Sequence, residues 1–193
     1  MRNPYELCRL NSSDFSEIYL FFDYDFQNKN LELAEINRQL KEMLSKFNDE
    51  TEYGKLYINY PMIESIRYTK ELPDANYYEY VISRADCSSF KKLAADFSAY
   101  SSFDFILIDS RKDVSKLSEK KLKSLRDNWE HLKKQNVNKA NYICHGKNEA
   151  PNKKEEVSQE QIFESQLQKH VNKEQSEVAI LNAFPLFLYE YFK

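Results

Sequence analysis

The sequence has very little glycine: only Gly54 and Gly146 occur among its 193 residues, whereas glycine averages ~7% of protein sequences. Phosphate-binding P-loops, G-x-G-x-x-G dinucleotide loops and G-x-S-x-G nucleophile elbows need closely spaced glycines, because the backbone must turn tightly or approach its ligand. None of these motifs can be drawn on this chain. The sequence therefore excludes P-loop ATPases, classical dinucleotide enzymes and α/β-hydrolases.

Cysteine is also scarce, and long apolar runs are lacking. Cys8, Cys87 and Cys144 are far apart and in no C-x-x-C spacing, which favours reduced thiols over disulfides or structural zinc. A bound metal would accordingly have oxygen ligands. No window approaches the ~18 apolar residues of a membrane span, and the N-terminus lacks the apolar core of a secretory signal. We therefore expect a cytoplasmic protein that does not associate with membranes.

The net charge of −3 excludes a broad basic surface for nucleic acid but leaves room for a local basic groove. Lysines gather between Lys112 and Lys134 and at Lys153 and Lys154, which a solvated helix face and a loop explain most simply. With 41% hydrophobic and 15% aromatic residues, the chain is apolar enough to fold around a core.

The most informative segment is 18–26, IYLFFDYDF, where five apolar or aromatic residues lead into Asp23 and Asp25. Such a run predicts a strand that is buried on both faces. Ligands bind at the carboxyl ends of strands in open α/β sheets, and two carboxylates there repel each other unless a proton or a cation lies between them. Mg²⁺ accepts carboxylates together with phosphate oxygens. The segment therefore predicts a metal site for phosphate chemistry.

A helix and a second strand follow and complete a β-α-β pattern. Residues 31–47 place apolar side chains at the three- and four-residue spacings of an amphipathic helix. Residues 55–60 predict a strand, and Pro61 suits the first turn of the helix after it, which carries Glu64 and Arg67 near its start. The pattern implies that the two strands are parallel neighbours.

The remaining sequence predicts a fold of the α/β class, with a mostly parallel sheet flanked by helices and a helix-rich C-terminal half. We expect residues 1–110 to form the core and residues 111–193 a helical extension that packs on it. The further elements expected are a short strand within 73–83, a helix over 86–100, a strand over 103–108 ending at Asp109, a helix over 117–137, a loop over 146–156, a helix over 158–171 capped by Ser158, a strand over 178–181 and a buried helix opened by Pro185.

The order FFDYDF, helix, KLYINYP and MIESIRY resembles the Toprim domain of nucleases of the overcoming-lysogenization-defect and RloB-like families of bacterial phage defence. In those proteins a strand ending in DxD is followed by a helix, a strand and a helix that begins with an acid. The resemblance covers residues 17–70. It implies Asp23, Asp25 and Glu64 as ligands of Mg²⁺ or Mn²⁺, and Glu64 and Arg67 as the catalytic residues of phosphodiester cleavage in DNA or RNA.

The chain departs from the Toprim pattern at its start. Toprim domains begin with an earlier strand that carries a catalytic Glu, and the residues ahead of Ile18 are too few to contain that strand and its helix. We expect either the C-terminal part of a longer protein or an abbreviated family, with an incomplete catalytic set in both cases. The candidate partners are nucleic acid, a partner protein and a second copy of the chain.

Residues outside this segment are weaker candidates. Lys139 and Lys147, like Arg67, could neutralise the charge of a phosphate. Asp109 would join the site if its strand neighbours the first, although a surface turn explains it more simply. His145 has no partner at metal-ligand spacing, which favours a loop histidine.

Other functions stay open. A non-catalytic scaffold could retain the fold and use residues 184–192, FPLFLYEYF, as a docking surface. A haloacid-dehalogenase-like phosphatase would use Asp23 as a nucleophile and Asp25 as a general acid, and some nucleotide-sugar glycosyltransferases also carry DxD at a strand end. The acids have structural explanations as well, because Asp25 can cap the helix that follows and Glu64 suits the first turn of a helix.

Overall fold

The computed structural model describes residues 14–98, 117–172 and 176–192. The strand expected over 103–108, Asp109 and the expected domain boundary at residue 110 lie outside the described residues.

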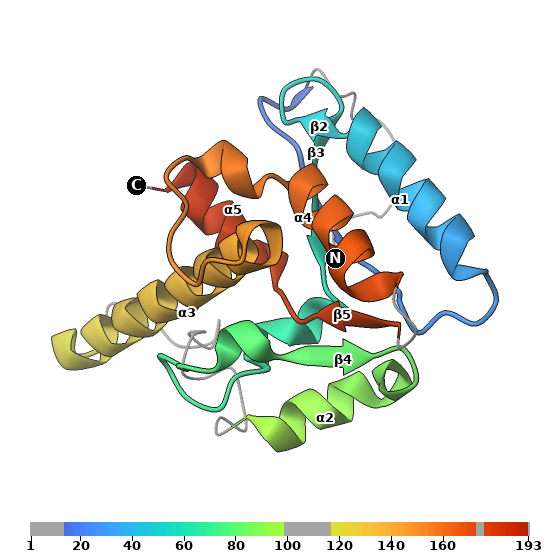
Figure 1. Cartoon of the computed structure of the whole chain (residues 1–193). Coiled ribbons are helices and arrows are strands. Elements are labelled where there is room, and N and C mark those ends of the chain that lie inside the picture. The colour runs from blue at the N-terminus through green and yellow to red at the C-terminus, as the bar shows by residue number, and fades with distance from the viewer. Residues whose placement is uncertain (1–13, 99–116, 173–175, 193) are drawn as a thin grey trace, which may run out of the picture.

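The predicted β-α-β unit is confirmed. Strand β1 (Tyr19–Asp23), helix α1 (Leu33–Lys46) and strand β3 (Gly54–Asn59) follow one another, and β1 pairs with β3 in parallel. Strand β2 (Asn48–Asp49) pairs with β3 in the antiparallel sense, so the sheet order is β1-β3-β2. In Figure 1, α1 lies on one side of β3, and α3 (Glu119–His145) and α5 (Ala183–Tyr191) lie on the other.

The prediction that the first strand is buried on both faces is wrong. The side chains of Phe21 and Phe22 are 37% and 43% exposed, because β1 lies at the edge of its sheet, with a hydrogen-bonded neighbour on one side among the described strands. The central strand β3 is the buried one, and its residues from Leu56 to Asn59 are almost inaccessible to solvent.

A second, smaller sheet joins distant parts of the chain. Strand β4 (Val81–Ser83) pairs with β5 (Glu177–Ala179) in the antiparallel sense, and Tyr60 and Leu181 form a bridge beyond the end of β3. The fold is therefore α/β with small mixed sheets. The mostly parallel sheet that the sequence predicted is not what the described strands form, since one of their pairings is parallel and two are antiparallel.

The two glycines both occupy backbone conformations that other residues rarely adopt. Gly54 has φ +104° where the chain enters β3, and a Cβ atom there would lie 3.0 Å from Cγ2 of Ile18. Gly146 has φ +75° and ends α3. It is the left-handed residue at which many helices stop.

The predicted helices over 86–100 and 158–171 are present as shorter pieces, and two short 3₁₀ helices, Tyr77–Glu79 and Lys154–Val157, lie where a strand and a loop were expected. The described helices besides α1, α3 and α5 are the 3₁₀ helices Ile63–Arg67, Tyr77–Glu79, Asp86–Ser89 and Lys154–Val157, the α-helices α2 (Phe90–Phe97) and α4 (Gln159–Gln166), and the π-helical turn Leu167–Val171. Ser158 caps α4 as predicted, since its side chain accepts a hydrogen bond from the Gln161 N–H. Helix α3 continues beyond the predicted end because Ala140 and Ile143 prolong its buried face.

Two helix predictions near proline are wrong. The helix expected to begin at Pro61 is only the short 3₁₀ helix Ile63–Arg67. Hydrogen bonds that join Ile63 and Ser65 to Leu181 and Asn182 hold this turn against the C-terminal segment. Helix α5 begins at Ala183, ahead of Pro185, since Asn182 caps it by accepting from the Phe184 N–H.

The hydrophobic core draws on both halves of the chain. Its buried residues run from Tyr24 near β1 to Leu186 in α5, and β5 from the second half pairs with β4 from the first. Residues of the predicted helical extension thus complete one core with those of the predicted α/β part.

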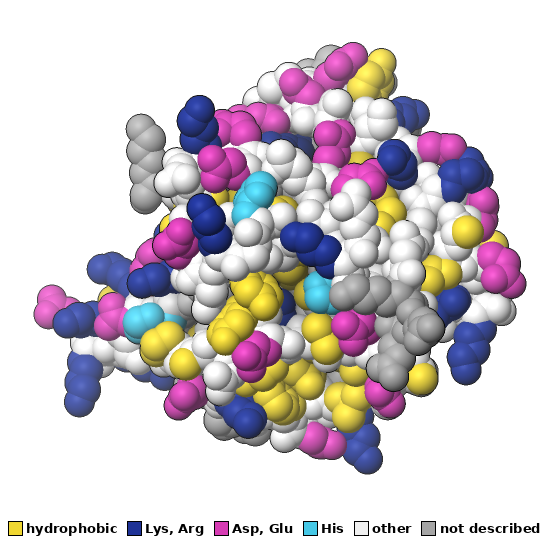
Figure 2. Space-filling view, viewed as in Figure 1, with side chains coloured by type: hydrophobic (Ala, Val, Ile, Leu, Met, Phe, Trp, Pro, Cys, Tyr) yellow, Lys and Arg dark blue, Asp and Glu magenta, His cyan; other side chains and the backbone are white. Residues whose placement is uncertain are grey.

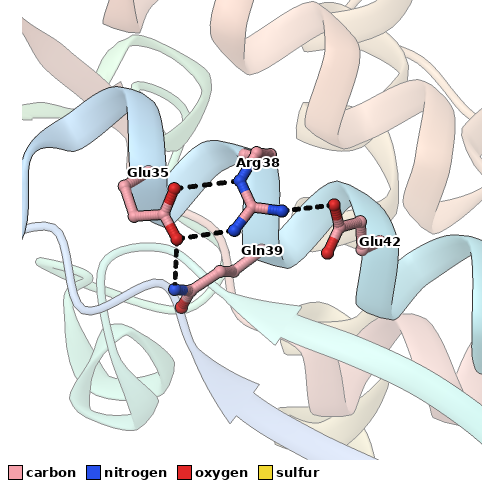
Figure 3. Close-up of polar contacts among 4 residues, drawn as sticks. All are labelled: Glu35, Arg38, Gln39 and Glu42. Atoms are coloured by element: carbon pink, nitrogen blue, oxygen red, sulfur yellow. Dashed lines mark hydrogen bonds and ion pairs between the residues drawn. The ribbon is translucent and has the colours of Figure 1, made fainter.

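The solvent face of α1 carries a charged network (Figure 3). The Arg38 guanidinium donates to both carboxylate oxygens of Glu35, at 2.9 and 2.7 Å, and to Glu42 at 2.5 Å. Gln39 adds a hydrogen bond to Glu35 at 2.6 Å. These contacts hold the pKa of Glu35 down, at about 2. The network consists of neighbours one helical turn apart, which support an exposed helix, and gives no indication of a binding site.

Candidate site at the ends of the parallel strands

Asp23 and Asn59 end the two parallel strands side by side. They are paired in the β1–β3 register, and Nδ2 of Asn59 donates to Oδ1 of Asp23 at 3.2 Å. The other end of the same amide is also fixed, because Oδ1 of Asn59 accepts the backbone N–H of Ala183 at 3.0 Å. A backbone N–H can only donate, so the Asn59 amide must present its NH₂ group to Asp23.

Glu64 is brought to Asp23 by the turn after β3. The backbone N–H of Ile63 is hydrogen-bonded to Asp23, and the charge of Glu64 acts on the same carboxyl group. Oε2 of Glu64 is buried and receives no hydrogen bond from any described residue. The structure therefore brings together two of the three predicted metal ligands, Asp23 and Glu64.

One cationic side chain lies beside the acids, and a second cationic residue holds its helix in place. Nζ of Lys91, from α2, is 3.2 Å from Oε1 of Glu64, although 74% of the Lys91 side chain is exposed. Nη2 of Arg67 donates to the backbone carbonyl of Lys91 at 2.9 Å, which holds α2 against the 3₁₀ helix. The site thus combines two carboxylates with the ammonium group of Lys91, while the hydrogen bond from Nη2 of the predicted catalytic Arg67 goes to the Lys91 carbonyl and not to the acids.

The pKa of Asp23 reports the balance of these groups. Partial burial of the carboxyl group raises its pKa, and the neighbouring charge of Glu64 raises it further. The hydrogen bonds from Asn59 and Ile63 and the charge of Lys91 lower it, and the net shift is upward. The ionised form of Asp23 therefore lacks full compensation in the isolated chain.

Asp25 faces a different set of partners. Its backbone has φ +54°, and its carboxylate accepts hydrogen bonds from Nε2 of Gln27 at 2.7 Å and Nδ2 of Asn28 at 2.9 Å. Side chains two apart in a strand share a face, but β1 ends at Asp23 and the left-handed turn breaks that alternation. After burial, the charge of Asp25 is the main cause that raises the pKa of the Cys87 thiol to about 12.

The joint role predicted for Asp23 and Asp25 gains no support from this geometry. Within the described ranges, no group of three or more His, Cys, Asp and Glu side chains could hold a metal ion. The general-acid role that a phosphatase would give Asp25 gains none either, since its carboxylate is used within the turn.

The weaker candidates lie elsewhere. Lys139 is fully buried and donates to the carbonyls of Tyr77 at 2.9 Å and Tyr80 at 2.5 Å, so the idea that it neutralises a phosphate is wrong. Burial lowers the pKa of its ammonium group well below the ordinary value. Nε2 of His145 lies 2.9 Å from the Glu156 carbonyl, as befits a histidine that fastens a loop.

Two residues of the site, Asn59 and Lys91, were not predicted from the sequence. Asn59 stands at the polar end of a predicted strand, and that position was the one signal available. No signal in the sequence pointed to Lys91, because its position depends on how α2 packs against the turn after β3.

Comparison with models of known protein families, with curated proteins and with solved structures finds no significant match. Among the helices of the described residues, none combines the length and the apolar character needed to cross a membrane.

Proposed function

We propose that this chain is a divalent-metal-dependent, nuclease-like protein of the Toprim type, in which Asp23 and Glu64 bind Mg²⁺ or Mn²⁺ next to a nucleic-acid phosphodiester. One observation carries the proposal: two carboxylates from separate elements meet at the ends of the parallel strands, one with a raised pKa and the other with a buried oxygen that receives no donor from any described residue. A divalent cation between them would favour the ionised form of Asp23 and supply a partner for Oε2 of Glu64.

The other groups suit a phosphate ligand. A bound ion would polarise a phosphodiester oxygen and orient it. Lys91 contributes positive charge beside Glu64, which would balance part of the charge of a phosphate and of its transition state. Asn59 keeps its NH₂ group on Asp23 and so orients that carboxylate.

The arrangement follows the order of the Toprim resemblance in two of its three acids. Asp23 ends the first strand and Glu64 follows the next one, as the resemblance implies, whereas Asp25 does not reach them. We therefore propose a single metal ion, held by two carboxylates and completed by water and substrate, and place Asp25 in the supporting turn.

A non-catalytic scaffold is the second candidate. It is favoured by the ion pair between Lys91 and Glu64, which already offsets one of the two negative charges without a metal. In that case the acids would hold α2 and the 3₁₀ helix onto the sheet.

Calorimetric titration with Mn²⁺ separates the two. We expect saturable binding by the wild type, and loss of binding in Asp23→Asn and in Glu64→Gln, which remove one ligand charge each with little change in shape. Asp25→Asn is the matched control and should still bind, because its carboxylate lies in the turn with Gln27 and Asn28. Failure of the wild type to bind Mn²⁺ would leave the scaffold in its place. Cleavage of labelled DNA and RNA oligonucleotides with and without Mn²⁺ then tests turnover.

A further inference from the structure

A row of aromatic rings leads to the candidate site. The ring of Trp129 in α3 lies 5.8 Å from that of Phe184 in α5, which lies 5.9 Å from that of Phe21 in β1. Phe21 also stacks on Tyr57 at 5.3 Å. Trp129 and Phe184 are half-buried and Phe21 is exposed. We call Trp129, Phe184 and Phe21 the aromatic ridge.

The ridge and the acid pair are parts of one surface. Phe21 and Asp23 are two residues apart in β1 and so lie on the same face of the strand, ~7 Å apart along it. Phe184 is also close to the site in sequence, because it follows Ala183. The N–H of Ala183 donates to the same Asn59 amide that donates to Asp23. The last ring of the ridge and the carboxylate of Asp23 therefore occupy successive positions on one face of β1.

The far end of the ridge is basic. Residues 119–134 of α3 contain six lysine and arginine residues against three acids, in a chain whose net charge is −3. Lys123, Arg126 and Trp129 follow one another at three-residue spacing and are neighbours on the helix surface. Figure 2 shows Lys and Arg side chains gathered on the arm that the N-terminal half of α3 forms at the left.

We propose that this surface binds single-stranded nucleic acid, with bases stacked on the aromatic ridge and the backbone running from Lys123 and Arg126 toward Asp23 and Glu64. Binding sites for single strands combine a positively charged track with aromatic side chains on which bases stack. A duplex hides the faces of its bases and would leave the rings unused. This inference gives the substrate class of the proposed nuclease site and rests on that function for the destination of the strand.

The flanking charges argue for nucleic acid over a protein partner. Lysine is depleted at protein–protein interfaces although arginine is enriched there, and five of the six cationic residues of 119–134 are lysines. Charge complementarity therefore favours a polyanion with aromatic bases.

The single tryptophan of the chain provides the test. In buffer with EDTA, a twelve-nucleotide single-stranded oligonucleotide should quench the Trp129 fluorescence of the full chain, and a fluorescein-labelled copy should show the same affinity by anisotropy. We expect Phe21→Ala to weaken binding by about tenfold, as loss of one stacked base implies. Because folding could suffer, circular dichroism and the melting temperature of each variant are measured alongside.

Two charge-matched double variants test the path of the bound nucleic acid over the surface. Lys123→Gln with Arg126→Gln should weaken binding and reduce its salt dependence, while Arg38→Gln with Lys41→Gln on α1, which removes the same charge from the opposite side of β3, should not. Equal weakening by both pairs would overturn the inference, as would tighter binding of the duplex form or no quenching at all. Dimers of the free protein, seen by sedimentation and lost in Phe21→Ala, would identify a second copy as the occupant instead.

The failure of this inference is distinguishable from that of the proposed function. Binding in EDTA does not require the metal, and Asp23→Asn should retain it. A chain that binds the oligonucleotide but not Mn²⁺ would refute the nuclease proposal alone, and a chain that binds Mn²⁺ but no single strand would refute this inference alone.

Discussion

Asn59 connects the candidate site to helix α5, and its replacement by alanine tests that connection. The residue is 1% exposed. Asn59→Ala leaves the N–H of Ala183 buried without its acceptor, which costs about 1–3 kcal/mol, and removes the hydrogen bond to Asp23, worth about 0.5–1.5 kcal/mol. We therefore expect the free energy of unfolding to fall by about 1.5–4.5 kcal/mol.

Urea unfolding followed by circular dichroism measures this loss. In a chain of this size each kcal/mol moves the melting temperature by ~2–4 °C, so a thermal scan should show the same change. Gln39→Ala is a suitable control, because Gln39 is exposed on α1 and makes its hydrogen bond to Glu35 in full solvent; it should scarcely change stability. A loss below about 1 kcal/mol for Asn59→Ala would refute the reasoning, because an unsatisfied buried N–H costs at least that much.

Asn59→Asp separates the two roles of the amide. An aspartate keeps an acceptor for the Ala183 N–H but cannot donate to Asp23 when ionised, and it places a second carboxylate beside the first. Both carboxyl groups should then have pKa values above the unfolded value of ~3.9. Since the folded state would bind more protons than the unfolded one, the stability of this variant should fall as pH rises through those raised pKa values. A pH profile parallel to that of the wild type would contradict the placement of the two groups.

Two further predictions concern Asp23 and the glycines. The pKa of Asp23 is raised above 3.8 and only its ionised form binds a cation, so calorimetry should show that the Mn²⁺ affinity falls as the pH drops through that raised pKa. An affinity that stays constant down to pH ~4 would contradict this prediction. By the same linkage, Asp23→Asn should stabilise the metal-free chain at neutral pH. Gly54→Ala should lower the free energy of unfolding in urea by about 1–3 kcal/mol, because a φ of +104° is strained for alanine and the new Cβ meets Ile18. Gly146→Ala, at φ +75° with open space around it, should lower it by only about 1 kcal/mol. Equal losses would show that the contact with Ile18 contributes nothing.

The sequence predicted those elements that local patterns determine. The apolar spacing of α1 and the runs of β1 and β3 specified a strand, a helix and a strand, and their parallel pairing followed from the connection between them. The exposure of β1 could not be read from Phe21 and Phe22, because burial of a strand depends on which strands flank it. Nor could the short 3₁₀ helix at Ile63 be read from the sequence, since the hydrogen bonds that hold it come from Leu181 and Asn182, far away in sequence.

The candidate site was predictable only in part for a related reason. Asp23 and Glu64 follow strands that are neighbours, and the ends of parallel neighbours meet at one edge. Asp25 was expected with them because it follows the carboxyl end of the same strand, but the strand ends at Asp23 and a left-handed turn gives Asp25 other partners. Lys91 and the orientation of Asn59 depend on α2 and α5, whose packing no local pattern records.

The register of β1 against β3 links the acid pair to the aromatic ridge. Phe21 pairs with Tyr57 and Asp23 with Asn59, so one face of the strand pair carries rings and then polar groups. A shift of one residue would turn every β1 side chain to the other face, removing Phe21 from Phe184 and Asp23 from Asn59 together. The proposed metal site and the aromatic ridge therefore depend on the same pairing of β1 with β3. A variant that keeps this register keeps the geometry of both.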